Sequence, residues 1–269
     1  MKPEPVSHAR FQKSLSALQR RAEEAARDCI DRPTPDAIHE ARIAIRKLKA
    51  GVSLAPREFR RDKKTVKSLK ALDALYADCA KIRDIDTMAE TLSAAWAAEA
   101  TKDVVAHLKR RRSLLLDRVM GSAIETRKLQ FPKSESLQRA RLRKRLRRLL
   151  DERTARAVRL YTVAASGEQY VEELHALRKE CRRIMYLMDF VKGSARVKPI
   201  RDELEDARQR LGLIREDDVL LDLIKGFRGG PRGVIVDRVA SGRQAKYRDF
   251  FSKQGLADPK LLKGIRSLA

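Results

Sequence analysis

Residues 39–50 read HEARIAIRKLKA, and residues 175–187 read HALRKECRRIMYL. Each stretch begins with a histidine, and arginines follow it three and seven positions later. His175 follows His39 by 136 positions in a chain of 269 residues. We therefore interpret the chain as a tandem duplication in which each half carries the same basic helix.

The basic residues of the first stretch share one predicted helix face, made of His39, Arg42, Arg46 and Lys49. At 100° per residue these four positions fall within an arc of about 80°. Apolar residues occupy a separate arc, namely Ile38, Ala41, Ile45, Leu48 and Val52. The second stretch has an equivalent apolar seam of Leu174, Leu177, Cys181, Ile184 and Met188. We expect one face of each helix to pack in a core and the other to stay available.

A second pair of matching segments supports the duplication. Residues 81–88, KIRDIDTM, parallel residues 213–220, LIREDDVL, so that Arg83 matches Arg215 and Asp86 matches Asp218. The offset here is 132 positions, which a four-residue difference in an intervening turn explains.

Composition and periodicity predict an all-α fold. Only 5% of the residues are aromatic, and long stretches rich in Ala, Leu, Arg, Lys and Glu repeat at helical spacing. The predicted helices cover roughly residues 8–30, 35–54, 60–80, 84–99, 102–124, 135–164, 168–191, 197–212, 216–227 and 233–253.

The charge balance predicts a polyanionic partner, because 61 Lys and Arg outnumber 37 Asp and Glu and leave a net charge of +24. Three scattered cysteines suggest neither a disulfide framework nor a metal site, and they favour a reducing cytoplasm. The N-terminal residues lack the apolar segment of a signal peptide, and no run approaches the roughly 18 apolar residues that span a bilayer. We expect a cytoplasmic protein without a membrane partner.

At this point the pattern resembles the CHAD family, the conserved histidine α-helical domains. The first half matches the family's histidine helix at His39, Arg42, Ile43, Arg46, Lys47, Leu48 and Lys49. The second half matches it at His175, Leu177, Arg178, Lys179, Arg182, Arg183, Tyr186 and Asp189, while Met185 stands where a third basic residue is expected. The family's Leu-Gly-x-x-x-Asp-x-Asp element is imperfect: Cys79, Ala80, Asp84 and Asp86 in one half, Leu211, Gly212, Glu216 and Asp218 in the other.

The resemblance implies an organisation as well as a ligand. It implies two helical bundles related by internal pseudo-twofold symmetry, and we divide them into residues 1–130 and 131–269, together one CHAD domain. It also implies that the two histidine helices lie near a shared basic groove or pore that binds inorganic polyphosphate, with localisation at polyphosphate granules.

Polyphosphate is a row of anionic oxygens without bases to read, so its binder needs many Lys and Arg donors along a track. The predicted site residues are His39, Arg42, Arg46, Lys47, Lys49, Lys63, Lys67, Lys70, His175, Arg178, Lys179, Arg182 and Arg183. The helically spaced lysines Lys63, Lys67 and Lys70 have a looser counterpart in the second half, made of Lys198, Arg201 and Arg208. The densest basic segment is residues 139–148. For the two histidines, a hydrogen bond that positions the helix is as good an interpretation as phosphate contact. A solvated helix face is the simpler interpretation of Lys63 to Lys70, or of Arg110 to Arg112, taken alone.

The acidic residues allow two interpretations. Asp84 and Asp86, or Glu216, Asp217 and Asp218, could hold Mg²⁺, but we favour acids at a helix start that pair with Arg83 or Arg215. No nucleotide-binding loop, zinc motif or nucleophilic arrangement occurs, so we predict a protein without cofactor or catalysis.

The main alternative is an RNA- or DNA-binding protein, since the same charge attracts any phosphate backbone. Sparse aromatic residues argue against base stacking, and we expect nucleic acid to bind more weakly. An enzyme of polyphosphate metabolism is a third possibility.

Overall fold

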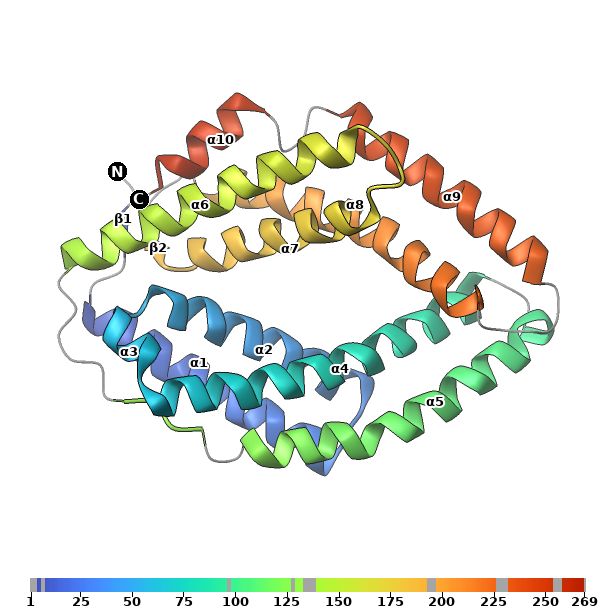
Figure 1. Cartoon of the computed structure of the whole chain (residues 1–269), viewed down its shortest axis with the longest axis horizontal. Helices are drawn as coiled ribbons and strands as arrows, with labels where there is room; N and C mark the ends of the chain where they lie inside the picture. The colour runs from blue at the N-terminus through green and yellow to red at the C-terminus, as the bar shows by residue number, and fades with distance from the viewer. Residues whose placement is uncertain are drawn as a thin grey trace. The chain divides into compact units, whose positions relative to one another are not determined.

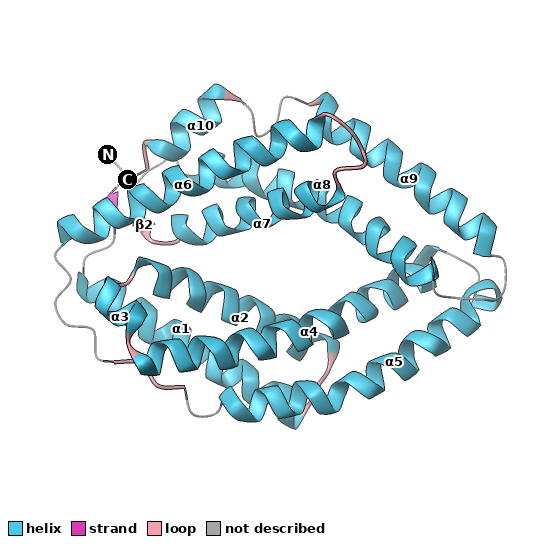
Figure 2. Cartoon of the chain, viewed as in Figure 1, coloured by secondary structure: helices cyan, strands magenta, loops and turns pink. Residues whose placement is uncertain are grey.

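The computed structural model of the chain describes residues 4–5, 8–95, 98–126, 129–132, 139–192, 197–225, 232–253 and 258–268. Helices account for nearly all of these residues, which confirms the predicted all-α class (Figures 1 and 2). The exception is an antiparallel pair of two-residue strands, in which Glu4 lies opposite Lys192 and Pro5 opposite Val191.

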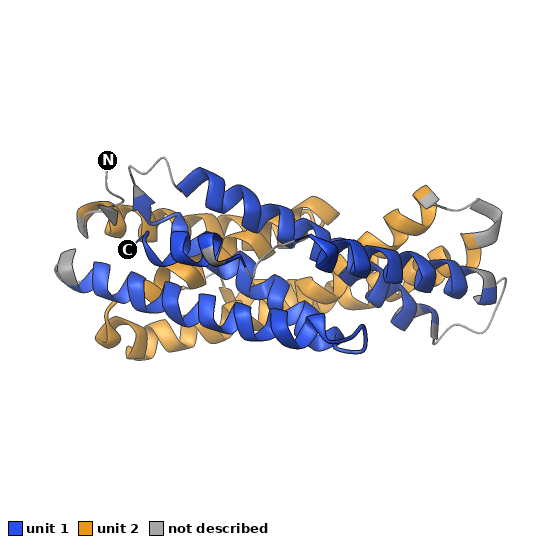
Figure 3. Ribbon diagram, turned by 90° about the horizontal axis from the view of Figure 1, so that it is seen from above, with its two compact units in different colours: residues 1–8, 138–269 blue, residues 9–137 orange. Residues whose placement is uncertain are grey.

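The chain divides into two compact units (Figure 3). Unit 1 comprises residues 1–8 and 138–269, and unit 2 comprises residues 9–137. The sequence predicts a division into residues 1–130 and 131–269; in the structure, the N-terminal strand pairs with residues 191–192 and belongs to unit 1. The pseudo-twofold relation between the halves stays a prediction.

Unit 2 is a bundle in which α4 packs against α2, α3 and α5. Its helices are α1 (His8–Asp31), α2 (Pro35–Leu54), α3 (Arg57–Arg61), α4 (Lys63–Ala95) and α5 (Ala98–Glu125). Thr34 caps α2 because its side chain accepts a hydrogen bond from the backbone N–H of Ala37, and Pro35 occupies the first helical position. The predicted apolar seam of α2 is buried.

Unit 1 stacks α6, α7, α8 and α9 in chain order, each helix against the next. Its elements are β1 (Glu4–Pro5), α6 (Arg139–Ala165), α7 (Val171–Met188), β2 (Val191–Lys192), α8 (Val197–Lys225), α9 (Arg232–Ser252) and α10 (Pro259–Arg266). Leu142, Leu146 and Leu149 form a buried seam through the basic start of α6. The predicted seam of α7 is buried as well, so the basic residues of both stretches are left on the other side of their helices.

Two predicted helix breaks are wrong. We expected helices to end near residues 80 and 212, but α4 and α8 continue through both positions. Asp84, Asp86 and Asp218 therefore lie inside long helices and not at helix starts. The short helices α3 and α10 were not predicted.

Among the described residues, no helix combines the length and the apolar character needed to cross a bilayer.

Candidate functional site

The basic face of α2 is held against α4 by two contacts. The guanidinium of Arg42 lies over the ring of Tyr76, 5.5 Å from its centroid. Lys49 forms an ion pair with Asp73, one turn earlier on α4. Arg42 and Arg46 are half-buried, and their Nε atoms are buried. The two arginines are thus anchored at the base of the guanidinium, which limits the conformations that the charged ends can take.

His39 lies at the start of this face in a setting that disfavours its charged form. Burial lowers the pKa of His39, and the nearby charges of Arg83, Arg46 and Arg42 lower it further. His39 is therefore mainly neutral near pH 7. Arg83 comes from α4, so this helix adds a cation to the surroundings of His39, a role that the sequence did not predict for Arg83.

Lys63, Lys67 and Lys70 occupy another side of α4. At 100° per residue, these positions lie about 120° to 180° around the helix from Tyr76, which faces α2. All three side chains are exposed. The structure does not bring them to the basic face of α2, and their part in binding stays a prediction.

The basic face of α7 has a different support. Gly212 of α8 lies beneath Arg178, because a Cβ atom built on Gly212 would be 3.3 Å from Nη2 of Arg178. Arg178 and Arg182 are half-buried, whereas Lys179 and Arg183 are exposed. Two of the basic residues of α8 that we expected to extend the binding track are paired with acids. Arg201 pairs with Asp189, and Arg208 pairs with Glu205. The arginine of this second pair lowers the pKa of Glu205 by hydrogen bonding.

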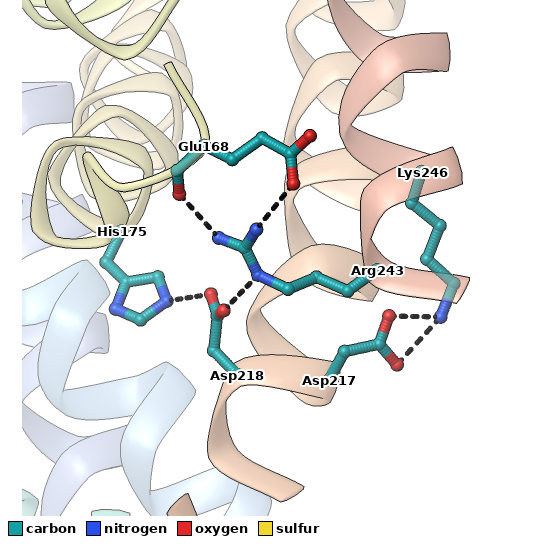
Figure 4. A network of polar contacts seen from close by, with 6 residues as sticks. All are labelled: Glu168, His175, Asp217, Asp218, Arg243 and Lys246. Carbon is teal, nitrogen blue, oxygen red and sulfur yellow. Dashed lines mark hydrogen bonds and ion pairs between the residues drawn. The ribbon is translucent and has the colours of Figure 1, made fainter. Parts of the chain in front are cut away.

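His175 begins a buried network that ties three segments of unit 1 together (Figure 4). Its Nε2 lies 2.8 Å from Oδ2 of Asp218 on α8. The other oxygen, Oδ1, accepts a hydrogen bond of 2.5 Å from Nε of Arg243 on α9. Arg243 also donates from Nη2 to the carbonyl oxygen of Glu168, in the loop before α7, at 3.1 Å. Next to this network, Lys246 pairs with Asp217 at 2.7 Å.

The charge on Asp218 is strongly favoured by these contacts. Burial alone raises the pKa of its carboxyl, but the hydrogen bonds from His175 and Arg243 outweigh burial and lower the pKa. The ring of His175 is bonded to this carboxylate, as a positioning role requires, and contact of His175 with phosphate stays a prediction.

Unit 2 contains an equivalent aspartate–arginine pair without a histidine. We call each pair a strut: Asp218 with Arg243 in unit 1, and Asp86 with Arg112 in unit 2. Arg112 of α5 donates from Nε to Oδ1 of Asp86 at 2.6 Å and from Nη2 to the carbonyl oxygen of Pro33 at 2.9 Å. Pro33 precedes α2 as Glu168 precedes α7. Oδ2 of Asp86 is buried and has no hydrogen-bond partner in the described part of the chain. Burial accordingly raises the pKa of Asp86, and the interactions with Arg112 offset this only in part.

These struts correct two interpretations from the sequence. Asp86 pairs with Arg112 and not with Arg83, and Asp218 pairs with Arg243 and not with Arg215. Arg112 is also no solvated surface residue, although Arg110 and Arg111 beside it are exposed. The signal was present, since Arg243 follows Arg112 by 131 positions, close to the offset of the two aspartates. This match was overlooked because Arg112 stands in a run of three arginines, residues 110–112.

Among the described residues, no group of three or more His, Cys, Asp or Glu side chains could hold a metal ion.

Comparison with known proteins gives the following matches. A family model described as "CHAD domain" matches residues 9–225. The crystal structure of the CHAD domain from the plant Ricinus communis is similar over 100% of this chain and 93% of that chain, with a TM-score of 0.57 and 15% sequence identity. No curated protein sequence matches.

Proposed function

Since the chain belongs to the CHAD domain family, we propose that it binds inorganic polyphosphate through the basic faces of α2 and α7, without altering the ligand. Arg42, Arg46, Arg178 and Arg182 make the central contacts. Lys47, Lys49, Lys179 and Arg183 add charge around them. The proposal includes association with polyphosphate granules in the cytoplasm.

The observation that carries this proposal is the anchoring of the arginines before any ligand arrives. Arg42 lies over the ring of Tyr76, and the guanidinium of Arg178 lies next to Gly212 of α8. The Nε atoms of both are buried, so ordering these long side chains costs little when an anion binds. Guanidinium groups bind phosphate oxygens in a bidentate fork, and such charge-assisted bonds are stronger than neutral ones.

A linear chain of phosphates suits these faces better than a nucleic acid does. Each helix presents its arginines one turn apart, about 6 Å, a spacing that the phosphates of either ligand can follow, so the aromatic residues make the distinction. Tyr76, the aromatic ring beside the α2 face, is covered by Arg42 and so is engaged in another contact. Base stacking needs open aromatic faces, so RNA and DNA are expected to bind through their backbones alone.

The test compares two pairs of substitutions in unit 2. Arg42→Gln with Arg46→Gln removes two charges from the basic face of α2, and Arg110→Gln with Arg111→Gln removes two exposed charges from α5. Fluorescence anisotropy with labelled long-chain polyphosphate should show roughly tenfold or greater weakening for the first pair, since contacts to charged groups are each worth about 1.5–3 kcal/mol. The second pair should lose much less, and thermal melting should show both proteins folded. Equal losses would mean that general charge, and not the face of α2, carries binding.

Competition separates the ligand classes. Unlabelled polyphosphate should displace the label at a lower phosphate concentration than mixed-sequence RNA or duplex DNA, with affinity falling as salt rises. More effective displacement by RNA would favour the nucleic-acid alternative. Incubation with Mg²⁺ should leave the length of polyphosphate unchanged on a sizing gel, and shortening that persists through purification would contradict binding without turnover.

A further inference from the structure

Three arginines surround one buried carboxylate where α6 packs against α7 in unit 1. Glu180 of α7 has a side chain that is only 1% exposed. Its oxygens lie 3.4 Å from Nη1 of Arg153, 3.4 Å from Nε of Arg156 and 2.5 Å from Nη1 of Arg183. We propose that this arginine cluster, Arg153, Arg156 and Arg183, is an anion subsite that takes a phosphate group of a condensed phosphate. The proposal rests on polyphosphate binding and extends it onto α6.

The charges in the arginine cluster are not balanced. One carboxylate faces three guanidinium groups, which leaves two positive charges in excess. None of the three arginines lies within 4.0 Å of a second carboxylate among the described residues. Like charges gathered around one small anion repel each other, and a bound phosphate group would relieve that repulsion.

The arginines also keep donors and exposure for a ligand. Their side chains are 32%, 53% and 50% exposed for Arg153, Arg156 and Arg183, although Glu180 beneath them is buried. The contacts from Arg153 and Arg156 are long compared with the 2.7–2.9 Å or so of a good charge-assisted bond. Each guanidinium has five N–H donors, so most of the donors of these two arginines are not used by Glu180. Glu180 is thus a positioning residue that gathers the donors from below.

The arginine cluster continues the basic face of α7 in one direction. Arg183 follows Arg182 directly, about 100° around the helix, on the side where Glu180 meets α6. Arg153 and Arg156 lie one turn apart on α6 and carry the row of donors onto that helix. A phosphate chain lying on α7 can therefore place one of its groups in the arginine cluster.

The described residues of unit 2 contain no counterpart of this arrangement. The offset of 136 positions places Ala44 where Glu180 stands, and Ala44 is buried. Lys47 stands in place of Arg183, and a lysine is a point charge without the planar fork of arginine. The subsite is accordingly a property of unit 1 alone.

Chemical labelling of the wild-type protein tests the subsite without relying on a variant. Phenylglyoxal modifies accessible arginines, and the modified peptides are counted by mass spectrometry. Sodium tripolyphosphate should slow the labelling of Arg153, Arg156 and Arg183 several-fold while leaving Arg110 and Arg111 unchanged. Unchanged labelling of the arginine cluster at saturating tripolyphosphate would overturn the proposal.

A pair of substitutions supplies the second measurement. Arg153→Gln with Arg156→Gln should weaken tripolyphosphate binding roughly tenfold in calorimetry, and Arg110→Gln with Arg111→Gln should leave it nearly unchanged. A loss of melting temperature with unchanged affinity would instead assign the arginine cluster a structural role only. Arg42→Gln with Arg46→Gln separates the two proposals, because it should weaken long-chain binding while the protection of Arg153 and Arg156 persists. If wild-type protein does not bind long-chain polyphosphate at all, the proposed function fails, whatever the arginine cluster does with tripolyphosphate.

Discussion

The two units use the same strut in different ways. In unit 1, both oxygens of Asp218 are engaged, one by His175 and the other by Arg243. In unit 2, Asp86 has the matching arginine, Arg112, but its second oxygen is buried without a hydrogen bond among the described residues. The histidine of unit 1 is therefore locked to the strut, whereas His39 lies among Arg42, Arg46 and Arg83 and is kept neutral by burial and by their charges. The same residue type is thus hydrogen-bonded to a carboxylate in one unit and surrounded by cations in the other.

The stability of the struts should show the largest difference. Asp218→Asn removes the charge that binds His175 and the buried Arg243, and we expect a loss of about 3 kcal/mol in the free energy of unfolding. Asp86→Asn should cost at most about 1 kcal/mol, because one oxygen of Asp86 already lacks a partner and Asn can still accept from Arg112. Urea unfolding followed by circular dichroism at pH 7 measures both. Similar losses in the two variants would remove the distinction between the struts.

The same variants should respond to acid with opposite signs. The lowered pKa of Asp218 contributes stability that is present above the unfolded-state pKa of about 4 and is lost as pH falls through the folded-state value. The deficit of Asp218→Asn relative to wild type should therefore shrink below about pH 4. The raised pKa of Asp86 means that its ionisation opposes folding at neutral pH, and this cost disappears as pH falls through the raised value. The deficit of Asp86→Asn should consequently grow between pH 7 and about pH 4, which a series of urea titrations would detect.

These struts mark the limit of what the sequence could predict. Periodicity was enough for the buried seams and the basic faces, because the neighbours that decide them lie within two helical turns. The arginine partners of Asp86 and Asp218 lie 26 and 25 positions away on another helix, and no local pattern indicates them. The acidic residues also suggested helix starts, yet cations from neighbouring helices stabilise them inside α4 and α8. Glu180 was missed for a similar reason, since its arginines come mainly from α6.

The pH dependence of polyphosphate binding should distinguish His39 from His175, by a smaller effect than the stability differences above. Phosphate oxygens near His39 favour its charged form, so binding raises its lowered pKa and takes up a proton. The affinity for long-chain polyphosphate should rise a few-fold, up to about tenfold, as pH falls from 8 to 6. His39→Gln should flatten this dependence with little change in stability. In contrast, His175→Gln should cost about 1 kcal/mol of stability by breaking the bond to Asp218. An unchanged pH profile in His39→Gln would show that another group takes up the proton.

Gly212 offers the finest comparison between the units. A Cβ at this position meets Arg178 at 3.3 Å, so Gly212→Ala should shift the guanidinium slightly and weaken polyphosphate binding about twofold. The same change should raise stability by roughly 0.5–1 kcal/mol, because alanine favours the helix interior. Ala80→Gly, at the matching position of unit 2, should lose a similar amount of stability with unchanged affinity. Calorimetry and thermal melting would show whether stability and affinity move in opposite directions for Gly212→Ala alone.

The strand pair of unit 1 has a consequence for the order in which the protein is completed during synthesis. Glu4 pairs opposite Lys192, so Glu4 must wait for almost two hundred further residues to be synthesised before its partner exists. At about 5–20 residues per second this delay is on the order of ten seconds or more. Unit 2, by contrast, takes all its residues from positions 9–137 and can fold as soon as they have emerged. Bringing the ends of so long a segment together also carries a large loop-closure cost, which grows only slowly with length. The N-terminal strand can therefore join unit 1 only after all residues of unit 2 have been synthesised.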